Sequence, residues 1–511
     1  MKFSAHPSFP THFSSDLLVL PVTESQVLAV KNQKKSIKSA FYTSPSLATL
    51  DALLGGSVSQ LLSKRKFAGK KEEQLLLTGL SAAFPSILLA GFDPAVADTF
   101  LKHDQYRSLG AQVAAVAKEV CATNATLVPS VLSLDKETSF AAFVEGILLG
   151  GYEYTAYKSK KSETVRLQEV SIVPCKRIDD RFLLKAQTLA EATIFARDLI
   201  NMPPNDCTPP YLVAVAKEVA SQGRLKLQVF EKAQLEKMGA HSFLSVAKGT
   251  SFPPYLIKMT YAPVTRTAKT KVISLVGKGI TYDTGGYSLK PGDSMIGMKG
   301  DMAGAASVLG VMKAVARLKP NVEVRGYIPT TENMINGEAT RVGDIVKAMN
   351  GKSIEILNTD AEGRLILADA LTLACKDKAH VVIDIATLTG ACMVALGLQY
   401  AGVFSDDKKL TDDIIEQGAI AGERFWPLPL APEYAASIKS SVADLKNIAG
   451  NRWAGATIGG LFLKEFVTPE TRWAHLDIAG PSDADSSRGH IKQGGVGFAV
   501  RTLTRMILNQ R

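Results

Sequence analysis

The segment 272–276 places the strongest limit on the fold of this chain. Its five residues carry no charge, and a glycine-rich segment, 277–286, follows it at once. An apolar strand of this kind is buried on both faces, as in α/β proteins, where helices cover both sides of a sheet. The segment therefore predicts a central strand in a helix-covered sheet.

The residues around this strand alternate between strand-like and helical patterns. Strand-like segments follow at 322–328, 353–357, 381–385 and 473–478, and helical patterns cover Ala303–Leu318 and 364–375. Such alternation predicts an α/β domain with a central mixed or parallel sheet flanked by helices. In sheets of this kind, ligands bind at the carboxyl ends of the strands.

The first part of the chain alternates in the same way. Strand-like segments lie at Leu17–Val22, 74–80 and 87–91, and helical patterns lie at 111–120 and 141–157. A long helical pattern, Asp180–Asn201, then ends before Pro203 and Pro204, which cannot continue a helix. We therefore expect an N-terminal α/β domain over 1–180 and a second domain over 181–511, with 181–201 as the connecting helix.

The net charge of the chain is +10, and lysines cluster at 31–38, 64–71 and 158–161. Clusters of this kind can bind nucleic acid through its phosphates, and they also occur as solvated loops. No aromatic interleaving or nucleic-acid-binding module accompanies them. Nucleic-acid binding is therefore carried only as an alternative function.

The five cysteines are scattered, with no C-x-x-C pair, so they predict neither a disulfide framework nor a thiolate zinc site. The first fifteen residues lack the apolar core of a secretory signal. We expect a reducing compartment, the cytoplasm or an organellar matrix. An uncharged stretch, 385–404, is long enough to cross a membrane, but its threonines and glycines favour a buried strand, loop and helix.

The octapeptide 358–365, NTDAEGRL, carries two acids and an arginine. On an extended backbone, Asp360 and Glu362 would point to the same face, because side chains alternate along a strand. Two aligned carboxylates form a hard-oxygen site for a divalent metal, and Arg364 could hold an anion in its planar guanidinium. An acid pair can equally be a solvated turn.

Further charged residues follow the predicted strand 272–276. They are Lys278, Asp283, Lys290 and Asp301. If this strand and the strand 353–357 are neighbours, all these side chains converge with Asp360 and Glu362. Four carboxylates repel one another unless cations neutralise them, and two divalent metals sharing carboxylates would do so. The metals would be held by oxygen and by a neutral lysine.

These residues resemble the leucyl (cytosol) aminopeptidase family. The octapeptide 358–365 matches that family's hallmark, and the segment 276–310 resembles its other metal-binding segment. Further matches are ARDLINMPPND at 196–206, VADLKNIAG at 442–450 and WAHLDIAG at 473–480. The resemblance covers residues 180–511 closely, and the first 180 residues fit the family's variable N-terminal α/β domain.

The resemblance implies a role for each matching position. One metal would be bound by Lys278, Asp283, Asp301 and Glu362, and the second by Asp283, Asp360 and Glu362. Lys290 would polarise the scissile carbonyl, and Arg364 would hold a bicarbonate ion that acts as general base. The wall that receives the first side chain and the amino terminus would consist of Met298, Asn358, Thr387 and Gly390.

The resemblance also implies an activity and an assembly. We expect a metallo-aminopeptidase that releases N-terminal amino acids, preferably leucine-like, from short peptides by two-metal activation of water. Zn²⁺, Mn²⁺ and Co²⁺ are the expected metals, with Mg²⁺ as a further candidate, and bicarbonate is the expected second cofactor. The family forms homohexamers, so we expect the same here, and we expect no association with a membrane.

Overall fold

The structure, a computed structural model, describes residues 1–9, 14–32, 45–160 and 166–510. The chain forms two compact units. The first consists of Met1–Ala190 with Ser487–Lys492, and the second of Glu191–Ser486 with Gln493–Arg511. Helix α6 (Asp180–Asn201) contains the position at which the chain passes from the first unit to the second.

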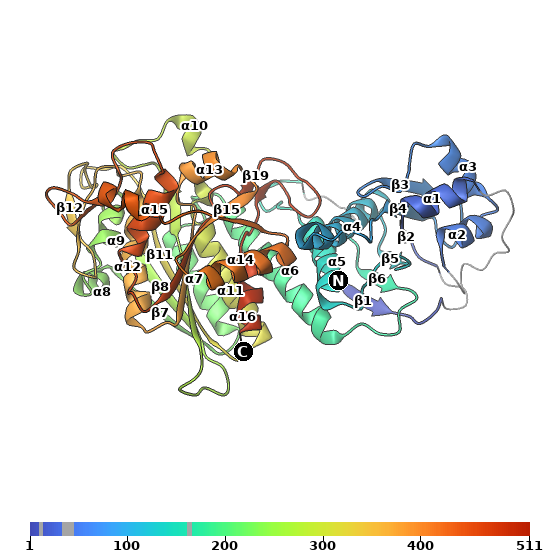
Figure 1. The fold of residues 1–511 in the computed structure, drawn as a ribbon, viewed down its shortest axis with the longest axis horizontal. Coiled ribbons are helices and arrows are strands. Elements are labelled where there is room, and N and C mark those ends of the chain that lie inside the picture. Colours follow the sequence, from blue (N-terminus) through green and yellow to red (C-terminus); the bar gives the residue numbers. More distant parts are fainter. Residues whose placement is uncertain (10–13, 33–44, 161–165, 511) are drawn as a thin grey trace. The chain divides into compact units, whose positions relative to one another are not determined.

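The first unit contains a six-stranded sheet in the order β1-β6-β5-β2-β4-β3 (Figure 1). All neighbouring strands are parallel except β3 and β4. The strands are β1 (Lys2–Ala5), β2 (Leu17–Val22), β3 (Gln74–Thr78), β4 (Ser86–Gly91), β5 (Asn124–Leu127) and β6 (Glu169–Ile172). The helices are α1 (Glu24–Lys31), α2 (Leu47–Leu53), α3 (Ser57–Lys64), α4 (Thr99–Glu119) and α5 (Glu137–Gly150). The predicted α/β class of this unit is confirmed.

The second unit is built on a nine-stranded mixed sheet in the order β16-β15-β18-β14-β9-β11-β8-β7, with β10 also paired to β11. Its four central strands run parallel: β18 (Arg472–Asp477), β14 (Val381–Ala386), β9 (Val272–Gly277) and β11 (Glu323–Asn333). The outer strands are β7 (Leu225–Phe230), β8 (Tyr255–Tyr261), β10 (Gly279–Asp283), β15 (Tyr400–Phe404) and β16 (Arg424–Pro427). The predicted central mixed sheet flanked by helices is confirmed.

Strand β9 is buried on both sides because helices cover both faces of this sheet. Val272 and Val276 belong to the hydrophobic core that also contains helix α12 (Glu362–Lys376). The alternate residue Gly277 lies against the backbone of Gly304 in helix α11 (Ala303–Leu318). Side chains alternate along a strand, so α12 and α11 pack on opposite faces.

The second unit contains further helices, of which α13 opens with Gly390 and α15 lies beside Arg364. They are α7 (Pro209–Ser221), α8 (Lys232–Lys237), α9 (His241–Val246), α10 (Gly292–Met295), α13 (Gly390–Leu396), α14 (Lys408–Ala421), α15 (Gly455–Lys464) and α16 (Val500–Asn509). The uncharged stretch 385–404 folds into the end of β14, helix α13 and strand β15. No helix in the described part of the chain has the length and apolar character needed to cross a membrane.

One predicted strand has a different place from the one expected. The segment 353–357 forms only the short strand β13 (Ser353–Glu355), which pairs with β12 (Ile345–Lys347) and β17 (Leu445–Lys446) in a separate three-stranded sheet. It is therefore not a neighbour of β9. The ends of two other elements also differ from the predicted ones. The helix predicted at 141–157 ends at Gly150, and the strand predicted at 322–328 continues to Asn333.

Candidate metal centre and active site

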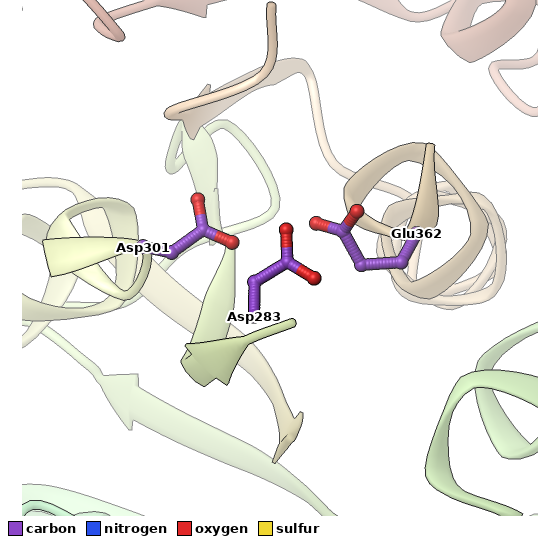
Figure 2. Close-up of side chains that lie close together, drawn as sticks. All are labelled: Asp283, Asp301 and Glu362. Atoms are coloured by element: carbon purple, nitrogen blue, oxygen red, sulfur yellow. The ribbon is translucent and has the colours of Figure 1, made fainter. Parts of the chain in front are cut away.

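Three buried carboxylates meet where the central strands end. Asp283 is the last residue of β10, Asp301 precedes α11, and Glu362 is the first residue of α12 (Figure 2). Each offers an oxygen, and these oxygens lie within 4.8 Å of one another. Three carboxylates at this spacing are the donor set that a divalent cation prefers.

The acid pair of the octapeptide is not on an extended backbone, so this expectation was wrong. Asp360 lies in a turn, where its backbone N–H donates to the side-chain Oδ1 of Asn358 at 2.8 Å. Glu362 opens helix α12 two residues later. An asparagine that closes a turn on its own backbone favours a helix start over a strand. Both carboxylates still reach the centre, but from a turn and a helix.

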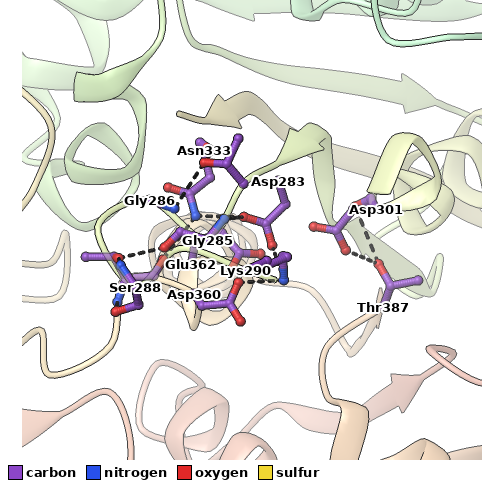
Figure 3. Close-up of polar contacts among 12 residues, drawn as sticks. Asp283, Gly285, Gly286, Ser288, Lys290, Asp301, Asn333, Asp360, Glu362 and Thr387 are labelled. Carbon is purple, nitrogen blue, oxygen red and sulfur yellow. Dashed lines mark hydrogen bonds and ion pairs between the residues drawn. The ribbon is translucent and has the colours of Figure 1, made fainter. Parts of the chain in front are cut away.

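Two lysines connect these carboxylates. Lys278 follows β9, and its Nζ lies 2.7 Å from Asp301 Oδ1 and 2.7 Å from Glu362 Oε1. Lys290 Nζ lies 2.9 Å from Asp283 Oδ2 and 2.5 Å from Asp360 Oδ1 (Figure 3). The four acids and two lysines predicted to converge do so, as two adjacent clusters.

Close backbone packing makes room for Lys278. A Cβ atom added to Gly363 would lie 2.7 Å from Lys278 Cε and 2.8 Å from its Nζ. These distances are shorter than any normal carbon contact, so the lysine could not keep its position beside a larger residue. The glycine between Glu362 and Arg364 in the octapeptide therefore has a steric function at this centre.

Burial changes the protonation of the carboxylates. It raises the pKa of Glu362 to about 8, with the nearby charge of Asp283 acting in the same direction. It also raises the pKa of Asp301 to about 6, although Lys278 opposes this increase. For Lys278 itself, burial lowers the pKa, but Asp301 and Glu362 outweigh burial and the pKa lies above its usual value. The cluster thus holds protons that a metal would have to displace.

Asn333, at the end of β11, joins the two sequence segments that build the centre (Figure 3). Its Nδ2 donates to Asp283 Oδ1 at 2.7 Å and to the carbonyl oxygen of Thr359 at 3.0 Å. Asn333 was not predicted, because the apolar strand pattern ends at residue 328, five residues before the strand itself ends. The signal that could have identified Asn333 is its position as a polar residue soon after the apolar strand pattern 322–328.

Arg364 is buried in α12, with 7% of its surface exposed. Its Nη1 donates to the carbonyl oxygen of Asn447 at 2.7 Å, and its Nε is buried with no hydrogen-bond partner in the described residues. Burial lowers the pKa of this guanidinium to about 10. A buried guanidinium with an unused donor fits a bound anion.

The predicted wall residues lie around the centre to different extents. Thr387 contacts it directly, because its Oγ1 donates to Asp301 Oδ1 at 2.7 Å and its carbonyl oxygen accepts from Lys278 Nζ at 2.9 Å. Asn358 forms the turn that holds Asp360. Met298 opens the short 3₁₀ helix Met298–Gly300 just before Asp301, and Gly390 opens α13.

The donor set fits a divalent metal. Asp301 Oδ2 is buried and makes no hydrogen bond to any described residue, so it has a free lone pair inside the cluster. Carboxylate oxygens are hard ligands that suit Zn²⁺, Mn²⁺, Co²⁺ and Mg²⁺. The residues present are therefore consistent with a divalent-metal site.

Fold and site together define a two-domain α/β protein with a carboxylate-rich centre at the strand ends of its larger domain. Sequence comparison then assigns the family. Residues 194–504 match the cytosol aminopeptidase family, catalytic domain, and residues 27–161 match the N-terminal domain of the same family. The chain belongs to the cytosol aminopeptidase family, whose members are peptidases. The resemblance described above is confirmed.

Relatives match over most of the chain. A probable cytosol aminopeptidase of Persephonella marina is 41% identical, covering 93% of this chain and 96% of its own. One from a Geobacter species is 42% identical, covering 89% and 92%. Among solved structures, a mutant tomato leucine aminopeptidase has a TM-score of 0.87 at 34% identity and covers 100% of this chain and 97% of its own. The bottromycin maturation enzyme BotP, solved in complex with Mn, has a TM-score of 0.81 at 31% identity and covers 97% and 99%.

The lysine clusters add nothing to the nucleic-acid alternative. Most of the cluster 31–38 lies outside the described residues, as does Lys161. Lys31 donates to the carbonyl oxygen of Phe67 at 2.7 Å, and Lys71 lies 3.7 Å from Glu72. The structure and the family matches contain no observation that favours nucleic-acid binding.

Proposed function

We propose that this chain is a metal-dependent aminopeptidase that removes leucine-like residues from the amino termini of short peptides. The observation that supports this most is the buried group Asp283, Asp301 and Glu362, whose oxygens lie within 4.8 Å of one another in a family catalytic domain. Such a group needs compensating positive charge, and a divalent metal supplies it.

Two metal positions would use the four carboxylates and Lys278. Lys278, Asp283, Asp301 and Glu362 would hold one ion, and Asp283, Asp360 and Glu362 the other. The candidate ions are Zn²⁺, Mn²⁺ and Co²⁺, with Mg²⁺ as a further candidate. When bound, such ions act as Lewis acids and lower the pKa of water. Lys278 must lose its proton to serve as a ligand.

Lys290 acts on the carbonyl of the peptide bond. Burial lowers its pKa, but Asp283 and Asp360 outweigh burial, so the pKa lies above its usual value and the ammonium stays charged at neutral pH. A charged donor aimed at the carbonyl oxygen stabilises the negative charge that develops there during attack by water. Only 14% of its side chain is exposed, which strengthens this interaction.

Arg364 would bind the bicarbonate ion that serves as general base. The guanidinium presents a planar pair of donors, a geometry that suits a planar three-oxygen anion. Burial of Arg364 would limit the orientations of an anion bound to it. Bicarbonate held there would supply a general base for the attacking water.

Selection of the chain end follows from the charges. A free α-amine would be a ligand for one of the metal ions. The nitrogen of an internal peptide bond would not, because its lone pair is delocalised into the carbonyl group. Met298 and its neighbours would receive the first side chain. An apolar wall of this kind prefers leucine-like residues but separates near-isosteres only by about 10–200-fold.

The direct test of this function compares two leucyl peptides that differ only at the amino terminus. With Mn²⁺ and bicarbonate present, the peptide with a free amine should release leucine, and its N-acetylated form should release at least about 100-fold less, because an acetylated nitrogen cannot bind a metal ion. Equal cleavage of both peptides, or cleavage at internal bonds, would show that the site does not recognise a free amino terminus.

A further inference from the structure

Asp477 is a buried carboxylate beside the metal centre that the proposed mechanism does not use. It is the last residue of β18, and none of its surface is exposed. Strand β18 pairs in parallel with β14, with Asp477 opposite Ala386, the last residue of β14. The carboxylate therefore lies where the loop 387–389 leaves the sheet.

Four donors from this region converge on Asp477. Its Oδ1 accepts from the backbone N–H of Leu388 at 3.2 Å, of Thr389 at 3.4 Å and of Ala479 at 3.2 Å. Its Oδ2 accepts from the hydroxyl of Thr389 at 2.7 Å. A carboxylate with this many donors fixes the loop 387–389 firmly, since hydrogen bonds to a charged acceptor are about twice as strong as neutral ones.

The loop held by Asp477 carries Thr387, which contacts two residues of the centre. Its carbonyl oxygen accepts from Lys278 Nζ. Its hydroxyl donates to Asp301 Oδ1 (Figure 3). Because β14 ends at Ala386, no strand pairing holds Thr387 in place. Its position is set by its own contacts with Lys278 and Asp301 and by the hydrogen bonds of the next two residues, which end on Asp477.

A simpler role would be an ion pair between Asp477 and Arg364, since the charge of Asp477 raises the pKa of Arg364 against the effect of burial. The contacts do not support a direct pair. The four donors to Asp477 come from Leu388, Thr389 and Ala479, and Arg364 uses its Nη1 on Asn447. Asp477 is thus committed to the loop, which leaves Arg364 available for an anion.

We infer that Asp477 is a positioning residue that acts through the loop 387–389 to orient Lys278 and Asp301. This inference rests on the proposed function, because it concerns the metal position that those two residues would build. The other position, made by Asp283, Asp360 and Glu362, forms no hydrogen bond or ion pair with the loop's residues in the described structure. Loss of Asp477 should therefore weaken the binding of one metal ion and leave the binding of the other unchanged.

The test is a calorimetric titration of the metal-free, full-length protein with Mn²⁺. In Asp477→Asn, one equivalent should bind about 10–100-fold more weakly, the range expected when a residue that orients metal ligands is lost, and the second should stay within about twofold of wild type. Thr389→Val removes the hydroxyl that donates to Asp477 and should also weaken the binding of one equivalent. Thr389→Ser keeps the hydroxyl and should bind both equivalents as wild type does. This pair carries the test if Asp477→Asn fails to fold.

The matched control is Asp384→Asn. Asp384 is also fully buried, and its oxygens bond to His475 Nδ1 at 2.6 Å and to Trp473 Nε1 at 2.7 Å, away from the loop. This variant should lose stability yet bind both equivalents normally. Wild-type affinity for both equivalents in Asp477→Asn, or equal weakening of both, would overturn the inference. If the wild-type protein binds no metal, this result contradicts the proposed function itself, and it is distinct from the results that would overturn the role of Asp477.

Discussion

At the scale of single residues, the protonation of Glu362 and Asp301 leads to a prediction about metal uptake. Their pKa values of about 8 and about 6 in the metal-free protein lie above the usual carboxyl range because both groups are buried. A metal ligates the ionised form, so binding must displace these protons. As the pH falls through 8 and then 6, affinity should decrease by up to about tenfold per pH unit for each proton displaced.

Calorimetric titration in two buffers of different ionisation enthalpy counts those protons. We expect protons to be released when metal binds at pH 7, where Glu362 is still largely protonated, and fewer to be released at pH 9. Binding that is independent of pH between 6 and 9 would contradict the protonation described here.

The residue types of the centre were predictable from the sequence, but their geometry was not. The two charged segments, 276–310 and 358–365, identified every acid and lysine that the structure brings together. Asn333 was missed because its role depends on a strand that continues further than its apolar pattern. Asp477 was missed because its partners, Leu388 and Thr389, lie about 90 residues away along the chain.

At the scale of elements, the close approach of α11 to the sheet leads to a second prediction. A Cβ atom on Gly304 would lie 2.1 Å from the carbonyl oxygen of Ile385 and 2.9 Å from the backbone nitrogen of Lys278. Both are backbone atoms, so the helix itself would have to move. Gly304→Ala should lower the free energy of unfolding by about 1–3 kcal/mol, as overpacking does.

Chemical denaturation measures this change, and Gly337→Ala is the control. A Cβ atom on Gly337 meets nothing within 4 Å, so this variant should be as stable as wild type. The start of α11 also lies next to Asp301, and the shift should therefore reduce peptidase activity as well. If Gly304→Ala matched its control in stability, the packing of α11 against β9 and β14 would not be as described.

The elements themselves were predicted better than their partners. Helices Asp180–Asn201 and Ala303–Leu318 match the structure at both ends, since their apolar periodicity and flanking breaks are local features. Strand β13 was predicted locally as well, but its pairing with β12 and β17 depends on segments as distant as residue 445. Which strands become neighbours is decided by tertiary packing, which a local pattern does not contain.

At the scale of the whole molecule, we propose that the chain assembles as a homohexamer and acts in the cytoplasm, as its family resemblance implies. Its second unit exposes large apolar side chains, among them Ile296, Val394 and Trp453 with 65–90% of their surface accessible. Light scattering at working concentration should give a mass about six times that of the 54.7 kDa chain, and a stable monomer would refute this.

The central claim is that the buried carboxylate cluster makes the chain a metal-dependent aminopeptidase. The most direct measurement is leucine release from a leucyl peptide by chelator-treated protein, before and after metal is restored, alongside Asp360→Ala. We predict that release falls by at least about 100-fold after chelation, returns with Mn²⁺, Zn²⁺ or Co²⁺, and does not return in Asp360→Ala. Full activity of the metal-stripped protein, or of Asp360→Ala, would contradict the account.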